Sequence, residues 1–196
     1  MNWVSKLFKK KNKVAIVRLE GTIAPSMTFG AGLNDVSVSK TIEKAFSFRK
    51  LSAVVLIINS PGGSPAQSSL IAARIKRLAK KNKTHVLAFC EDVAASGGYW
   101  LACAADEIFA DENTIIGSIG VISSGFGFHE LIERQGIERR VYTSGEDKSI
   151  LDPFRPQKQA DIKKLKKLQG QIHENFISYV KLSRGEKIKS EDIFSG

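Results

Sequence analysis

The stretch DVAASGGYW at residues 92–100 places a serine where its neighbours have almost no bulk. Small flanking residues leave room for a substrate, and glycine amides beside the serine can donate hydrogen bonds to an oxygen atom of that substrate. Ser96 is therefore a candidate nucleophile, and the alternative is that its side chain caps the helix that follows. A second glycine-rich stretch, NSPGG at residues 59–63, can direct another amide at the same oxygen. Two such donors form an oxyanion hole, the site that stabilises the charged intermediate of acyl transfer.

A serine nucleophile needs a base that removes its proton. The sequence contains three histidines, and no spacing ties any of them to Ser96: His85, His129 and His173. A lysine can act as the base when its pKa is lowered enough to leave the amine neutral. The residues alone do not choose among the many lysines of this chain.

The elements that must position these residues alternate along the chain. Apolar runs predict strands at residues 14–19, 53–58, 84–90, 107–110 and 139–144, with a glycine-interrupted run at 115–124. Helical spacing predicts helices at residues 39–50, 64–81, 96–105, 128–136 and 157–184, and residues 22–38 are expected to form a loop. The alternation predicts an α/β domain with a mostly parallel sheet, and both glycine-rich turns then lie at the carboxyl ends of strands, where ligands bind.

Three motifs occur in order: INSPGGS at 58–64, DVAASGGYW at 92–100 and IIGSIGV at 115–121. Together they resemble the bacterial signal peptide peptidase A / protease IV family, which includes the SohB-type proteases. The resemblance extends from about residue 14 to the end of the chain. Members of this family are Ser–Lys dyad proteases with a crotonase-like (Clp-protease-like) fold of repeated β-α units. The resemblance therefore implies a serine endopeptidase with that fold.

The resemblance implies a role for each of five residues. Ser96 corresponds to the nucleophile, and Lys148, in the segment TSGEDKSILDPF, corresponds to the general base. Ser118 is implied as the hydrogen-bond partner that positions the lysine amine. Gly63 and Gly97 are implied as the two oxyanion donors, through their backbone N–H groups.

The chain departs from the family pattern in three places. Asp147 precedes the lysine where family members often carry an aromatic residue, and a neighbouring carboxylate raises the pKa of an amine. Family members usually carry a signal or membrane-spanning segment before the catalytic region, and this sequence contains no such pattern. The family pattern also continues beyond residue 196, so a C-terminal element is expected to be missing from the peptidase domain, residues 14–196.

The net charge is +10, with basic clusters at residues 6–13 and 162–168. Neither cluster carries the signature of a nucleic-acid-binding module, so no nucleic acid is expected as a partner. Residues 1–13 form a basic tail whose apolar residues recur at helical spacing: Trp3, Val4, Leu7 and Phe8. This pattern suits peripheral contact with an anionic membrane, and a frayed tail is the alternative. A peripheral membrane or cytoplasmic location is expected.

Cys90 and Cys103 lie in apolar segments and are expected to be buried free thiols, and neither a cofactor nor a metal is expected. The expected substrate is a peptide, such as a signal-peptide remnant or a membrane-associated peptide. The resemblance also implies a homo-oligomer, because the family forms rings in which the serine and the lysine meet at subunit boundaries. Two other functions stay open: a non-catalytic scaffold or partner subunit inactivated by truncation, and a crotonase-type acyl-CoA enzyme.

Overall fold

The computed structural model describes residues 13–25, 32–145 and 148–196. The chain divides into unit 1 (Met1–Gly120 and Phe176–Gly196) and unit 2 (Val121–Asn175), and each unit is described by itself. Apart from Lys13, the basic tail lies outside the described residues. No helix in the described ranges is long and apolar enough to cross a membrane.

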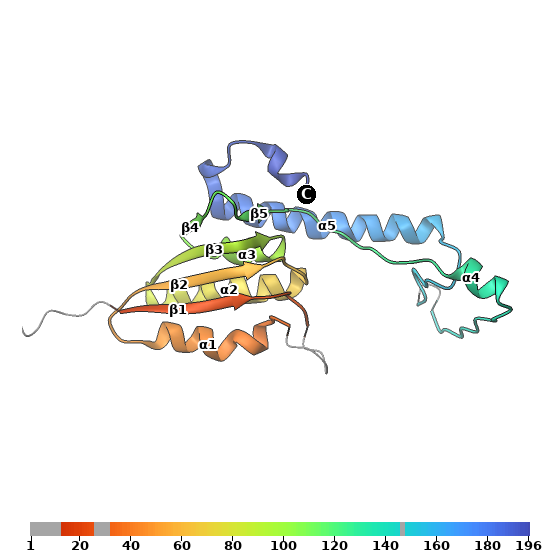
Figure 1. Ribbon diagram of the computed structural model, residues 1–196, viewed down its shortest axis with the longest axis horizontal. Helices are drawn as coiled ribbons and strands as arrows, with labels where there is room; N and C mark the ends of the chain where they lie inside the picture. Colours follow the sequence, from red (N-terminus) through yellow and green to blue (C-terminus); the bar gives the residue numbers. More distant parts are fainter. Residues whose placement is uncertain (1–12, 26–31, 146–147) are drawn as a thin grey trace, which may run out of the picture. The chain divides into compact units, whose positions relative to one another are not determined.

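Within the described residues, unit 1 contains a five-stranded sheet in which every pairing is parallel (Figure 1). The strands are β1 (Lys13–Glu20), β2 (Leu51–Ser60), β3 (His85–Ala95), β4 (Glu107–Ala110) and β5 (Ile115–Gly117). Strands β1 to β4 lie side by side in sequence order. The first half of β3 pairs with β4, and its last residues pair with β5. The predicted α/β class with a parallel sheet is confirmed.

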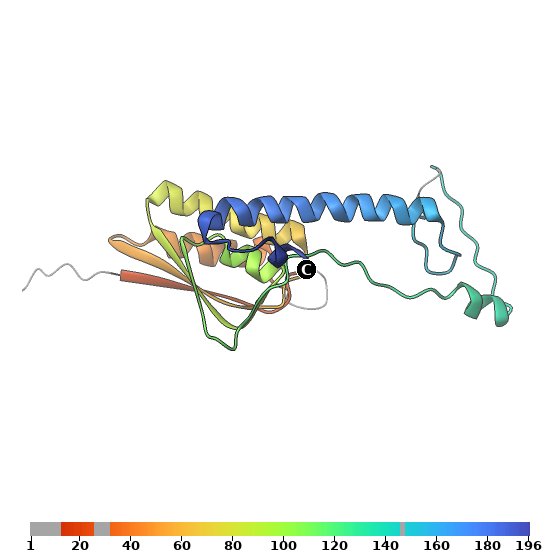
Figure 2. The same cartoon turned by 90° about the horizontal axis from the view of Figure 1, so that it is seen from above.

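Three helices of unit 1 pack on one face of this sheet: α1 (Asp35–Ser47), α2 (Pro65–Asn82) and α3 (Gly97–Ala102) (Figures 1 and 2). The strands show the expected period of two, because the side chains that face the helices are buried and the alternate ones are not. Ile42 of α1 and Ile75 of α2 meet this buried face, and both are fully withdrawn from solvent. Helix α5 (Gln159–Arg184) adds Phe176 to this core, where it stacks on Trp100 of α3 with ring centroids 4.6 Å apart.

The opposite face of the sheet carries exposed apolar side chains, among them Ile16 of β1. Phe89 of β3 and Phe109 of β4 stack there with ring centroids 4.8 Å apart. Arg18 of β1 reaches past β2 to Glu91 of β3, which accepts two hydrogen bonds of 2.7 Å. This polar bridge is exposed to solvent, so it contributes little to stability.

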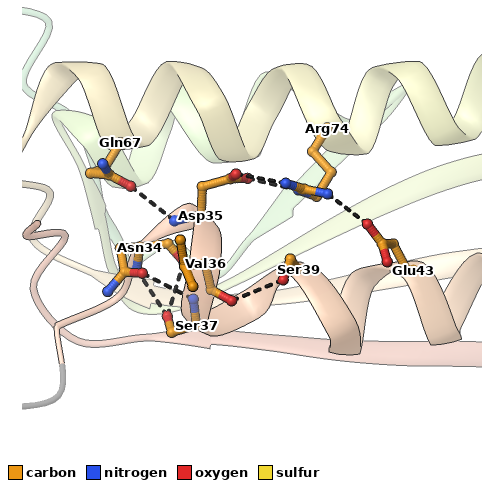
Figure 3. Close-up of polar contacts among 8 residues, drawn as sticks. All are labelled: Asn34, Asp35, Val36, Ser37, Ser39, Glu43, Gln67 and Arg74. Atoms are coloured by element: carbon orange, nitrogen blue, oxygen red, sulfur yellow. Dashed lines mark hydrogen bonds and ion pairs between the residues drawn. The ribbon is translucent and has the colours of Figure 1, made fainter. Parts of the chain in front are cut away.

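Helix α1 begins earlier than predicted, at Asp35 instead of residue 39. The Asn34 side chain accepts a 2.9 Å hydrogen bond from the Ser37 amide, and the Ser37 hydroxyl accepts one of 3.1 Å from the Asn34 amide (Figure 3). This capping box satisfies amides that otherwise lack partners at a helix start. The predicted loop over residues 22–38 was therefore too long at its C-terminal end.

Unit 2 contains the short helix α4 (His129–Arg134), which lies within the predicted helix at 128–136. The predicted strand at 139–144 was wrong, because these residues have no regular structure. A strand needs a partner for its ladder of hydrogen bonds, and the described part of unit 2 contains no strand that could pair with residues 139–144. No apolar residue in the described part of this unit is buried. Phe128 and Phe154 approach one another, with ring centroids 5.7 Å apart.

Candidate active site

Ser96 forms the sharp turn between β3 and α3. Its backbone has φ +53° and ψ −120°, a conformation that residues other than glycine rarely adopt. It occupies the N-cap position of α3, yet its side chain makes no capping hydrogen bond. A strained serine between a strand and a helix is the geometry that exposes the nucleophile in α/β-hydrolases. The capping alternative raised by the sequence therefore has no support at Ser96.

A second serine turn of this sheet, after β2, behaves differently. Ser64 is the N-cap of α2, and its side chain accepts a 3.4 Å hydrogen bond from the Gln67 amide. Pro65 occupies the first helical turn, as the sequence predicted. The Ser64 hydroxyl thus caps α2, whereas the Ser96 hydroxyl, in the equivalent position before α3, makes no capping hydrogen bond.

The glycine-rich turns after β2 and β3 are in direct contact. A Cβ atom on Gly62 would lie 2.6 Å from the Gly97 nitrogen and 2.8 Å from the Ser96 Cβ, distances that real side chains do not tolerate. Gly62 also has φ +94°, which favours glycine. Parallel neighbouring strands end at the same edge of the sheet, and this is why the two turns meet.

The amides implied as oxyanion donors are located in these two turns. The Ile23 backbone flanks Gly63 on both sides: its N–H donates to the Gly62 carbonyl (2.8 Å), and its carbonyl accepts from the Ser64 N–H (2.7 Å). Within the described residues, the Gly63 N–H itself has no acceptor. Gly97 is the first residue of α3, where an N–H has no partner inside the helix. Gly63 is exposed and Gly97 is buried, and the convergence of their N–H groups on one oxygen stays a prediction.

Ser118 lies beside the Ser96 turn in unit 1. The Ser96 N–H donates a 2.7 Å hydrogen bond to the Gly117 carbonyl, at the end of β5. Ser118 follows directly, with an exposed side chain and φ +51°. It lines a cavity of about 340 Å³ together with Tyr99 of α3. The structure therefore brings together four of the five predicted site residues: Gly63, Ser96, Gly97 and Ser118.

Lys148 belongs to unit 2, where it is exposed and its N–H donates a 3.4 Å hydrogen bond to the Gly145 carbonyl. Asp147, which the sequence singled out as a departure from the family, lies outside the described residues. The pairing of Lys148 with Ser96 stays a prediction, because the two residues belong to different units.

One contributor to the site was not recognised in the sequence. Ile23 holds the turn that contains Gly63 through its backbone alone, and it lies in a segment without periodic apolar spacing. The Ile23 side chain is almost fully buried. An isolated apolar residue in a polar loop was the one sequence signal that could have indicated this burial. No cluster of metal-binding side chains occurs in the described ranges.

Residues 78–195 match a family model described as Peptidase family S49. The chain belongs to peptidase family S49. Membership in S49 confirms the resemblance to signal peptide peptidase A, protease IV and SohB, and it confirms the Clp-protease-like fold. The S49 chain is 31% identical over 200 residues to "Serine protease SPPA, chloroplastic" of Arabidopsis thaliana, a match that covers 99% of this chain and 29% of that protein.

Two further relatives of this S49 chain are bacterial. It is 49% identical over 191 residues to a protein named "Na(+)/H(+) antiporter NhaA" from Brucella melitensis, with 95% of this chain and 26% of that protein covered. It is 37% identical over 126 residues to "Protease 4" of Haemophilus influenzae, with 64% of this chain and 20% of that protein covered. The S49 chain thus spans less than a third of the length of these relatives.

Proposed function

We propose that this S49 chain is a serine endopeptidase in which Ser96 is the nucleophile and Lys148 the general base. The observation that carries the proposal is the Ser96 turn, which combines a strained backbone, an uncapped hydroxyl and two neighbouring glycine amides. Relatives named serine protease and protease 4 support the same activity. They do not favour the scaffold alternative, and membership in a peptidase family argues against an acyl-CoA enzyme.

In the proposed reaction, the neutral amine of Lys148 accepts the proton of the Ser96 hydroxyl as its oxygen attacks a peptide carbonyl. The N–H groups of Gly63 and Gly97 donate to the resulting oxyanion, and each such donor is typically worth about 3–4 kcal/mol. The C–N bond then breaks, and the lysine returns the proton to the leaving amine. Water attacks the acyl-enzyme next, with the lysine again as base. Ser118 is proposed to hold the amine through a hydrogen bond.

Self-association is part of this proposal. The described part of unit 2 exposes large apolar side chains, including Ile122, Phe126 and Tyr142, and none of its apolar residues is buried. Burial of apolar surface contributes about 25 cal/mol per Å², so such a unit gains stability by packing against another surface. We propose a second copy of the chain as that surface and the subunit boundary as the place where Lys148 reaches Ser96.

The proposed substrates are signal-peptide remnants or other membrane-associated peptides. Peripheral contact with an anionic membrane through the basic N-terminal residues would place the enzyme near them. A vesicle flotation assay with and without residues 1–12 tests this part of the proposal. Equal flotation of the two forms would contradict it.

The decisive experiment uses a fluorophosphonate probe, which labels activated serines, on the purified chain and on three variants. Ser96→Ala and Lys148→Ala should both lose labelling, while Ser64→Ala, which removes a structural cap, should retain it. Labelling of Ser96→Ala would overturn the nucleophile, and labelling of Lys148→Ala would overturn the base. Absence of labelling in a folded, assembled wild-type protein would favour the scaffold function instead.

A further inference from the structure

Arg74 of α2 binds Asp35, the first residue of α1, in a bidentate ion pair (Figure 3). Its Nε donates to one Asp35 oxygen at 2.7 Å, and a second nitrogen donates to the other oxygen at 2.6 Å. Glu43 accepts a third hydrogen bond of 2.6 Å from the same guanidinium. The Arg74 and Asp35 side chains are only 20% and 19% exposed. Paired, partly buried bonds of this kind fix orientation as well as adding energy.

A second contact attaches the same residue to α2. The Asp35 N–H donates a 2.9 Å hydrogen bond to the Gln67 side-chain oxygen (Figure 3). The Gln67 N–H in turn donates to the Ser64 hydroxyl. The start of α1 is thus fastened at two points to the helix that follows the NSPGG turn. Both contacts involve the first residue of α1, so they fix the N-terminal end of this helix against α2.

The segment before α1 leads from Asp35 to the proposed oxyanion donor. Leu33 donates from its N–H to the Thr22 carbonyl (3.0 Å) and accepts from the Ala24 N–H (3.1 Å). Residues 22–24 are therefore held against the residues that immediately precede α1. Ile23, at the centre of this segment, forms the two hydrogen bonds that flank Gly63. Each step between Arg74 and Gly63 is either a hydrogen bond or a link of one or two residues along the chain.

We propose that Arg74 is a positioning residue, which acts through Asp35 and residues 22–24 to set the direction of the Gly63 N–H. The inference rests on the proposed function, in which this N–H stabilises the oxyanion. Donors must lie about 2.7–3.1 Å from the oxyanion to be effective. A misplacement of about 1 Å can cost on the order of 100-fold in rate, so a distant anchor of the donor affects catalysis.

The test compares Arg74→Met and Asp35→Asn with Arg18→Met, a matched control that removes the exposed Arg18–Glu91 pair on the other face of the sheet. Peptide hydrolysis should show a kcat about 10-fold lower in both test variants with KM nearly unchanged, because an oxyanion contact exists only in the transition state. Arg18→Met should keep the wild-type kcat. Arg74→Lys retains the charge without the paired geometry and should give an intermediate kcat.

Amide hydrogen exchange provides a readout that does not depend on activity. The Ile23 and Ser64 amides should exchange faster in Arg74→Met and Asp35→Asn than in the wild type, and Arg18→Met should leave them unchanged. Unchanged exchange in both test variants would overturn the positioning role, whatever the activity of the protein. Faster exchange with an unaltered kcat in an active enzyme would also overturn it. An inactive wild type with faster exchange in the variants would refute the proposed function and leave the anchoring of the Gly63 turn supported.

Discussion

The backbone N–H of Ser96 donates a 2.7 Å hydrogen bond to the carbonyl oxygen of Gly117. This bond fastens the turn after β3 to the end of β5 and places Ser118 one residue away. Ser96 and Ser118 both have positive φ angles, +53° and +51°. Such conformations cost about 1–3 kcal/mol each and persist only where the surroundings impose them. The backbone is therefore strained at Ser96 and Ser118, the two serines that have roles in the proposed mechanism.

Replacing Ser96 by glycine should stabilise the protein while abolishing probe labelling. Glycine adopts positive φ without penalty, and no capping bond is lost, so we expect the free energy of unfolding to rise by about 1 kcal/mol. Ser64→Ala, which removes a real cap, should instead lower it by about 1 kcal/mol. Urea denaturation measures both values. A less stable Ser96→Gly would show that the serine backbone is not strained.

Gly62→Ala should destabilise unit 1 strongly. The new methyl group would collide with the Gly97 nitrogen and the Ala95 carbonyl, and the residue would keep a positive φ. We expect a loss of about 2–4 kcal/mol in the free energy of unfolding, as for other overpacked or strained sites. Gly125→Ala is the control, because a Cβ there meets open space, and its effect should stay within about 0.5 kcal/mol. Thermal unfolding of both variants checks the difference, and equal melting temperatures would contradict the contact.

The stabilising effect of Asp35 should depend on pH. Its hydrogen bonds from Arg74 hold the pKa of the Asp35 carboxyl below its usual range, although burial opposes the shift. A lowered carboxyl pKa stabilises the fold above the unfolded-state value of about 3.9, and this stabilisation is lost as the pH falls through the folded-state pKa. The wild type should therefore exceed Asp35→Asn in stability near neutral pH, by a margin that shrinks below about pH 4. Denaturant titrations across this range measure the margin, and a constant margin down to acid pH would refute the linkage.

Cys90 and Cys103 are buried free thiols, as the sequence predicted. Burial raises the pKa of each thiol to about 11, so almost no thiolate, the reactive form, is present at neutral pH. Ellman's reagent should react slowly with the native protein and rapidly once guanidinium chloride has unfolded it. Equal rates in the two conditions would mean that the thiols are accessible in the native state.

Substitutions on unit 2 should weaken self-association. Phe126 and Tyr142 are 81% and 92% exposed, and aromatic residues often dominate the binding energy of an interface. Phe126→Ser combined with Tyr142→Ser should raise the dissociation constant by at least about 10-fold, measured by analytical ultracentrifugation. Val36→Ser is the control, since Val36 is 78% exposed in unit 1. An oligomer unaffected by the double substitution would place the interface elsewhere.

The sequence predicts the parts of this fold that depend on local signals. Apolar runs located strands β1 to β4 of the sheet, whereas β5 lies within a run that was described only as glycine-interrupted. The Ser64–Pro65 pair marked the start of α2, and parallel pairing implied that the two glycine-rich turns meet. The start of α1 was missed because a polar capping box, and not apolar periodicity, fixes it. Residues 139–144 have the composition of a strand, but local composition does not provide a pairing partner.

The residues of the candidate site also differ in how far the sequence predicts their positions. Gly63, Ser96, Gly97 and Ser118 lie in turns at strand ends, so the order of elements is enough to bring them to one edge of the sheet. Lys148 is different, because it lies in an irregular segment of unit 2, and the order of strands and helices does not predict where such a segment lies. The ion pair of Arg74 with Asp35 was also not predicted, because the two residues are far apart in the chain and look like ordinary surface charges in the sequence.

The absence of a buried apolar residue in the described part of unit 2 has a consequence for how that unit becomes ordered. Fixing each residue of a chain costs about 1–2 kcal/mol of backbone entropy, and an interior normally offsets this cost. If the apolar side chains of unit 2 are buried only against a neighbouring copy of the chain, dilution dissociates the copies and removes this burial. Residues 121–175 should then become susceptible to proteases as the protein concentration falls, at temperatures where the parallel sheet remains intact.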